Sequence, residues 1–118
     1  PLYPIQIDVN LIKRVISNLV ENAIKYSGEN RTIEISSTDD EKHVYIDIKD
    51  NGVGMAPKDI EHIFDKFYRV KNDANYKIKG TGLGLYLVKY FVELHGGNIS
   101  VESTIDQGTT FKIKLINK

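Results

Sequence analysis

The sequence predicts a single α+β domain with one two-layer core, and three observations support this. The chain has 118 residues, which is enough for one such core. Residues 9–26 carry apolar side chains at the three-and-four spacing of an amphipathic helix, and residues 85–94 form a second helical stretch. Four segments alternate in pairs, as β-hairpins do: 32–38 with 43–49, and 98–103 with 109–115.

Composition excludes several classes of protein. The net charge is zero and no basic cluster forms, so no electrostatic footprint for nucleic acid is present. Without cysteine, disulfide and thiolate chemistry are impossible. No apolar run approaches the roughly 20 residues of a membrane-spanning helix, and no signal-peptide pattern is found. The chain starts with Pro1 rather than Met, so we expect residues 1–118 to be one domain cut from a longer protein.

The first helix is expected to begin after Asp8, a good N-cap, and to end before Ser27-Gly28. Residues 1–7 before it are short and apolar and are expected to form an edge strand, where Pro4 is tolerated. The helix is expected to bury one apolar face, made of Ile12, Val15, Ile16, Leu19, Ala23 and Ile24.

Asn18, Asn22 and Lys25 follow the helical spacing on an adjoining face. Asparagine is unfavourable inside helices because its amide competes for backbone hydrogen bonds. The three residues are either solvent-facing or a row of ligands. An amide oxygen binds a hard cation such as Mg²⁺, and a lysine binds phosphate.

Asp50 continues the apolar face of the second strand of the first hairpin, after Val44, Ile46 and Ile48. The segment Asp50-Asn-Gly-Val-Gly-Met is either a simple strand-ending turn or a site in which a buried carboxylate accepts a hydrogen bond from a ligand. Glycine at 52 and 54 would let the backbone approach a flat ring closely.

A short helix is expected over residues 57–64, with Ile60, Ile63 and Phe64 inward. Taken singly, Arg69 is a surface residue. Residues 70–79 lose the apolar pattern and are expected to form an irregular loop, which at this length is typical of a lid or a binding segment.

Gly80-Thr-Gly-Leu-Gly-Leu leads into the second long helix, for which Leu85, Leu87, Val88, Phe91, Val92 and Leu94 are expected to supply the buried side. The loop is either a flexible hinge or an anion site, since the first N–H groups of a helix are unpaired. Three glycines at alternate positions favour phosphate. The spacing fits neither a P-loop nor a dinucleotide-binding loop.

In the last strand Thr109 shares the core face with Phe111, and its hydroxyl could reach a buried site.

Four motifs in a fixed order resemble the ATP-binding catalytic domain of bacterial sensor histidine kinases. Together with the closing Gly108-Thr-Thr-Phe they cover essentially the whole chain. They are Asn-Leu-Val-Glu-Asn-Ala-Ile-Lys-Tyr-Ser at 18–27, Asp-Asn-Gly-Val-Gly-Met at 50–55, Ile-Phe-Asp-Lys-Phe-Tyr-Arg-Val at 63–70, and Gly-Thr-Gly-Leu-Gly-Leu at 80–85. The resemblance implies the Bergerat fold of the GHKL ATPases: a two-layer α/β sandwich with a mixed, mainly antiparallel sheet, helices on one face, and residues 70–79 as the ATP lid.

The resemblance also implies ATP and Mg²⁺ as cofactors and assigns residues to the phosphate end. Asn22 would bind Mg²⁺ through its amide oxygen, and Asn18 would support the phosphates or the metal. Lys25 and Tyr26 would contact the phosphates, and Arg69 would approach the terminal phosphate and help phosphoryl transfer. Asn22, Lys25 and Arg69 are the expected catalytic residues.

At the base end, the resemblance implies that Asp50 accepts a hydrogen bond from the adenine amino group, that Gly52 and Gly54 let the base lie against the backbone, and that Thr109 closes the adenine pocket. The loop expected to hold the phosphates comprises Gly80, Thr81, Gly82, Leu83, Gly84 and Leu85.

By this resemblance the chain is the nucleotide-binding half of a protein histidine kinase, inactive alone. It would supply the γ-phosphoryl group of Mg-ATP for autophosphorylation of a histidine in a separate dimerisation domain of the same parent protein, which then acts on a response regulator. The resemblance places the domain in the cytoplasm, as part of a membrane-bound sensor, and we expect the isolated domain to be monomeric and to bind no nucleic acid.

Two alternatives remain open. In hydrolytic relatives a glutamate occupies the position of Asn18 and activates water, whereas an asparagine amide is barely basic. Glu21 is about 100° from Asn22 around the helix. A self-contained ATPase therefore lacks its base. A degenerate interaction module would lack nucleotide binding.

Overall fold

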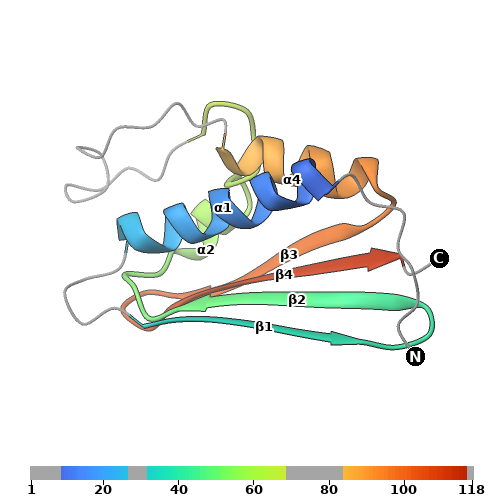
Figure 1. The fold of residues 1–118 in the computed structure, drawn as a ribbon. Helices are drawn as coiled ribbons and strands as arrows, with labels where there is room; N and C mark the ends of the chain where they lie inside the picture. The colour runs from blue at the N-terminus through green and yellow to red at the C-terminus, as the bar shows by residue number, and fades with distance from the viewer. Residues whose placement is uncertain (1–8, 27–31, 69–83, 117–118) are drawn as a thin grey trace.

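The computed structural model describes residues 9–26, 32–68 and 84–116 as a two-layer α+β domain (Figure 1). Helices α1 (Val9–Tyr26) and α4 (Gly84–Leu94) lie against one face of a four-stranded sheet, and the short helix α2 (Pro57–Ile60) lies near one end of it. This confirms the predicted fold class. Residues 1–8, 27–31, 69–83 and 117–118, which include the expected edge strand, the Asp8 cap and the lid, lie outside the described residues.

The sheet consists of two hairpins joined through their inner strands. Its strands are β1 (Ile33–Asp39), β2 (His43–Asp50), β3 (Asn98–Thr104) and β4 (Gly108–Ile116), in the order β1-β2-β4-β3. Every pairing among these four strands is antiparallel. The register aligns Ile48 with Phe111 and Asp50 with Thr109, so the C-terminal end of β2 lies beside the N-terminal end of β4.

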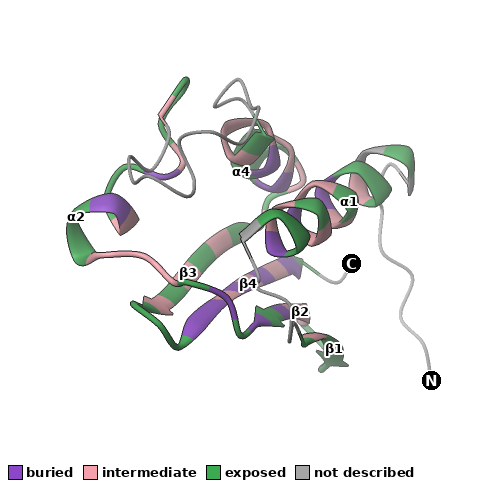
Figure 2. Cartoon of the chain, turned by 90° about the vertical axis from the view of Figure 1, so that its left-hand side faces the viewer, coloured by how far each residue is buried: buried purple, intermediate pink, exposed green. Residues whose placement is uncertain are grey.

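Apolar side chains from both layers meet in one core. Val15 and Leu19 of α1 and Val88 and Val92 of α4 are fully buried. On the sheet the buried residues alternate, as the sequence predicted, and include Ile48, Phe111, Ile113 and Leu115. Figure 2 shows that buried residues gather between the layers, whereas β1 is largely exposed. Neither described long helix is apolar enough over its length to cross a membrane.

Two residues that we expected in the core are exposed. Ile24 is 43% exposed and Leu94 is 62% exposed. The helical pitch explains both, because Ile24 lies about 140° around the axis from the completely buried Leu19, and Leu94 about 160° from Val92.

The helix predicted over residues 57–64 is shorter than expected. Helix α2 ends at Ile60, and the chain continues in turns in which the N–H of His62 donates to the carbonyl of Asp59 and the N–H of Asp65 to that of His62. These bonds span three residues rather than four, which tightens the chain and ends the α-helical geometry. Ile63 is buried nonetheless.

The core predicts a contrast between two positions on α1. Leu19→Ala removes a completely buried side chain and is expected to lower the free energy of unfolding by about 3 kcal/mol. Ile24→Ala, on the same helix, is the control and is expected to change it by less than about 1 kcal/mol. Urea denaturation followed by circular dichroism measures both. Equal losses for the two variants would contradict this core.

Candidate functional site

The predicted site residues that the structure describes lie toward one end of the molecule. The C-terminal end of α1, the end of β2, the start of β4 and the N-terminal end of α4 all lie toward the left of Figure 1. Helix α1 contacts both α4 and β2. This end therefore combines residues that are far apart in the sequence: Asn22 on α1, Asp50 on β2, Gly84 on α4 and Thr109 on β4.

Asp50 is a buried carboxylate at the end of the core-facing row of β2. It is 7% exposed and is paired across the sheet with Thr109, which is equally buried. Its Oδ1 accepts a hydrogen bond from the Gly52 N–H at 2.8 Å, and the backbone N–H of Thr109 also donates to the carboxylate. Burial raises the pKa of Asp50 above its ordinary value of 3.8, and the two N–H donors only partly oppose this effect.

Ser103 joins three elements at the same end of the sheet. Its hydroxyl lies 2.8 Å from the hydroxyl of Thr109, donates to the carbonyl of Gly108 at 3.0 Å and accepts from the N–H of Met55 at 2.8 Å. Our sequence analysis did not single out Ser103. The alternation of β3 could have indicated it, because Ser103 follows Ile99 and Val101 on the inward-facing side of that strand. Asp50 stands in the same relation to the inward-facing residues of β2.

The loop after Asp50 is held against the β3–β4 turn. The N–H of Asp106 donates to the carbonyl of Val53 at 2.8 Å. Gly54 has φ +69°, and a Cβ atom there would overlap the carbonyl of Thr104. Gly54 is thus required by its own packing, which is a different reason from the approach of a base that we expected. Gly108 has φ +117°, and a Cβ atom there would overlap the carbonyl of Asp50.

The polar row on α1 lies beside the buried stripe of the helix. Asn18 and Asn22 are half-buried, whereas Lys25 and Glu21 are exposed. The two amides are therefore held near the domain surface on one flank of the helix, and Glu21 lies on a different side of it. The side chain of Tyr26 lies outside the described residues.

Only part of the expected phosphate loop is described. Gly84 begins α4, is exposed, and has no atom within 4 Å of where a Cβ would lie, while Leu85 packs against the core. Arg69 and the other expected loop residues, Gly80, Thr81, Gly82 and Leu83, lie outside the described residues. The described ranges contain no group of three or more His, Cys, Asp or Glu side chains placed to hold a metal.

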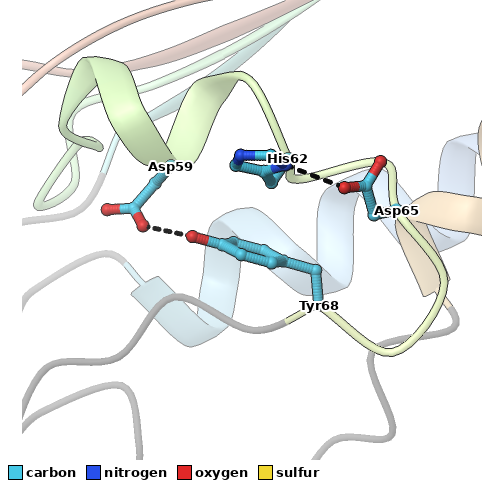
Figure 3. A network of polar contacts seen from close by, with 4 residues as sticks. All are labelled: Asp59, His62, Asp65 and Tyr68. Atoms are coloured by element: carbon cyan, nitrogen blue, oxygen red, sulfur yellow. Dashed lines mark hydrogen bonds and ion pairs between the residues drawn. The ribbon is translucent and has the colours of Figure 1, made fainter.

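A second polar cluster lies just before Arg69 in the sequence (Figure 3). Asp59 is 8% exposed, and its Oδ1 accepts a hydrogen bond of 2.6 Å from the hydroxyl of Tyr68. His62 and Asp65 form a contact of 2.9 Å between Nδ1 and Oδ2, but both are more than half exposed, so this pair contributes little stability. The hydrogen bond to Asp59 connects Tyr68 to α2.

The turn between Asp65 and Tyr68 has an unusual backbone. Phe67 has φ 68° and is 64% exposed. A bulky residue in the left-handed region stores strain that its neighbours must offset. The Lys66 Nζ lies 5.5 Å from the ring centre of Phe67 and 5.7 Å from that of Tyr86, which links the turn to α4.

Comparison with known proteins identifies the class of domain that this fold and site define. Residues 7–117 match the family model of the histidine kinase-, DNA gyrase B- and HSP90-like ATPases. The chain belongs to this family, as its four motifs predicted.

Two similar sensor proteins are much longer than this chain. It is 42% identical over 113 residues to the sensor histidine kinase WalK of Bacillus subtilis and 40% identical over 108 residues to the sensor protein SrrB of Staphylococcus aureus. These alignments cover 94% and 92% of this chain but only 18% of either relative.

Solved structures show the same fold. The mycobacterial sensor histidine kinase MprB matches with a TM-score of 0.86 at 27% identity, covering 98% of this chain and 78% of that one. The catalytic domain of the histidine kinase ThkA matches with a TM-score of 0.81 at 32% identity, covering 96% and 71%. Full-length ShkA in complex with AMPPNP matches with a TM-score of 0.82 at 28% identity, covering all of this chain and 24% of that one.

The bond between Asp59 and Tyr68 predicts a loss of stability in Tyr68→Phe. The variant leaves a buried carboxylate without its phenolic donor and is expected to lower the free energy of unfolding by about 1–2 kcal/mol. Tyr90→Phe, at a tyrosine that is 52% exposed, is the control and should change it little. Urea denaturation at neutral pH measures both variants.

The same bond has a defined pH dependence. The hydrogen bond to Asp59, aided by burial and by the charges of Asp59 and Asp65, raises the pKa of Tyr68 above its ordinary value of 10.0. The contribution of this hydrogen bond to the free energy of unfolding is therefore complete below pH 10. It is lost as the pH rises through the folded-state pKa of Tyr68. A difference between wild type and Tyr68→Phe that grew above pH 10 would contradict this assignment.

Proposed function

We propose that this chain binds Mg-ATP and supplies its γ-phosphoryl group for autophosphorylation of a histidine in a separate dimerisation domain. The observation that carries the proposal is the buried Asp50 carboxylate beside Thr109, at the end of the molecule where α1 and the start of α4 also lie. A carboxylate is costly to bury in a core for stability alone, so its burial favours a binding role.

The residues at the end of the sheet fit an adenine base. An ionised carboxylate accepts hydrogen bonds and cannot donate them, so Asp50 matches the exocyclic amino group of adenine and not the carbonyl of guanine. Gly52 and Thr109 donate backbone N–H groups to this carboxylate and so hold it in place for the base. The named complex of ShkA with AMPPNP, an adenine nucleotide, supports this choice of ligand.

The residues on the helices fit the phosphates and the metal. Mg²⁺ usually keeps several waters and uses phosphate oxygens as ligands, so one amide from Asn22 is a compatible protein ligand. Asn18 orients the phosphates or the metal, and Lys25 supplies positive charge. Gly84 leaves open space at the N-terminal end of α4, where the helix dipole favours an anion. Arg69, directly after Tyr68, would approach the terminal phosphate.

The chain is proposed to be a kinase half rather than a hydrolase. ATP, when bound, supplies the phosphoryl group. Asn18 cannot act as a general base, and the exposed Glu21 lies on another side of α1. In this proposal the acceptor histidine belongs to a part of the longer parent protein, consistent with the small share of WalK and SrrB that the chain covers. The names of these relatives support a sensor kinase. The cytoplasmic location of the catalytic domain and a response regulator as its partner are part of the proposal.

Titration calorimetry of this chain with ATP tests the proposal. Wild type is expected to bind ATP more tightly with Mg²⁺ than without it. Asn22→Ala is expected to weaken the Mg²⁺-dependent binding by at least about tenfold, equivalent to roughly 1.4 kcal/mol. Glu21→Ala is the matched control on the same helix and should bind as wild type does.

Phosphate release from the same samples separates the candidate functions. Binding with negligible turnover is the expected result for a kinase half. Sustained turnover would replace this proposal with a self-contained ATPase, and its loss in Glu21→Ala would identify the base. A wild-type chain that binds no nucleotide would be a degenerate interaction module.

The raised pKa of Asp50 predicts that ATP affinity falls on acidification. Only the ionised carboxylate is a pure acceptor, and burial shifts its protonation to a pH above 3.8. The ratio of wild-type to Asp50→Asn affinity should therefore decline as the pH falls, because the titration of the ATP phosphates affects both proteins equally. A ratio that did not change with pH would contradict the role of Asp50.

Asp50→Asn is a suitable control because it is expected to stay folded. A carboxyl whose folded-state pKa is raised favours the folded state most below its ordinary value of 3.8, and that contribution declines as the pH rises through the folded-state value. The buried charge therefore costs stability at neutral pH, and asparagine removes it.

A further inference from the structure

The contacts of Ser103 determine where its proton and that of Thr109 lie. A hydroxyl donates one hydrogen bond and accepts two. The N–H of Met55 can only donate, and the carbonyl of Gly108 can only accept. Ser103 therefore accepts from Met55 and donates to Gly108. Its remaining lone pair faces the Thr109 hydroxyl at 2.8 Å, so all three contacts form together only if Thr109 donates to Ser103.

This proton arrangement changes what Thr109 offers to a ligand. With its proton directed to Ser103, the Thr109 oxygen retains only lone pairs. Thr109 is the cross-strand neighbour of Asp50 on the core-facing side of the sheet, and the ionised Asp50 is also a pure acceptor. The end of the sheet thus presents two acceptors side by side, which suits a group with two N–H donors and disfavours a carbonyl.

We infer that Ser103 is a positioning residue for base selection: it holds the Thr109 hydroxyl as an acceptor and so favours a 6-amino purine over a 6-keto purine. The inference rests on the proposed function, because it concerns the same nucleotide site. Without Ser103, the Thr109 hydroxyl is free to rotate and to donate to a carbonyl. Asp50 would then be the one remaining group of this pair that disfavours a 6-keto purine. Ser103 acts through Thr109 and needs no contact with the nucleotide.

Affinities for ATP and inosine triphosphate test this role, since the inosine base has a carbonyl in place of the adenine amino group. Calorimetry on Ser103→Ala is expected to show the preference for ATP over inosine triphosphate reduced about fivefold to tenfold, the size expected for one hydrogen bond. Ser103→Thr retains the hydroxyl and should restore most of the preference. Ser100→Ala, at an exposed position on the same strand, should leave it unchanged.

A double-mutant cycle with Thr109→Val identifies the route of the effect. Thr109→Val alone is expected to lower the preference for ATP, and Ser103→Ala should change it no further in that background. An equal loss of affinity for both nucleotides in Ser103→Ala would show a merely structural role and would overturn the inference. If Ser103→Ala does not fold, an unchanged preference in Thr109→Val would overturn it equally.

The hydrogen bonds themselves can be measured without nucleotide. In the NMR spectrum, the Met55 amide is expected to shift upfield and to exchange faster with solvent in Ser103→Ala than in wild type or Ser103→Thr. An unchanged Met55 amide would overturn the proton arrangement. Wild type that binds no ATP would overturn the proposed function and the base selection with it, while the Met55 result would still report on the Ser103 contacts.

Discussion

The burial of the Asp50 carboxylate is the constraint on which this end of the domain depends. Strand alternation puts Asp50 in line with the core residues of β2, where a charge is stable only if donors surround it. The donors are backbone N–H groups of Gly52 and Thr109, so the turn after β2 and the start of β4 must both be placed accurately. The raised pKa shows that these donors only partly offset the cost of burial.

Two glycines pack closely against the backbone near this carboxylate. Gly108 lies against the carbonyl of Asp50, where no side chain fits. Gly54 has the same relation to Thr104. Ser103 then supplies the side-chain hydroxyl that joins the loop after β2 to both strands of the second hairpin. The glycines are needed for backbone packing whether or not a base lies near them.

The sequence predicted the parts of this arrangement that depend on periodicity. Alternation placed Asp50 and Thr109 on the core face, and the helical spacing placed α1 within its observed bounds. Ser103 was missed because its importance lies in contacts with residues up to 48 positions away in the sequence. Ile24 and Leu94 were misplaced because residue type was given more weight than angle around the helix. The bond between Tyr68 and Asp59 depends on turns that no short-range pattern predicts.

The two halves of the proposed site are built on different elements, and this separates their tasks. The base end is formed by β2, β3 and β4, where hydrogen bonds of 2.8–3.0 Å connect side chains to one another and to neighbouring backbone. In the proposal, the phosphate end would use Asn18, Asn22 and Lys25 on α1, together with the start of α4. In the proposed function, base recognition is therefore preorganised by the sheet, so it contributes equally to binding ATP and ADP. Discrimination between the two nucleotides must come from the helices and from the residues around Arg69, where the terminal phosphate would lie.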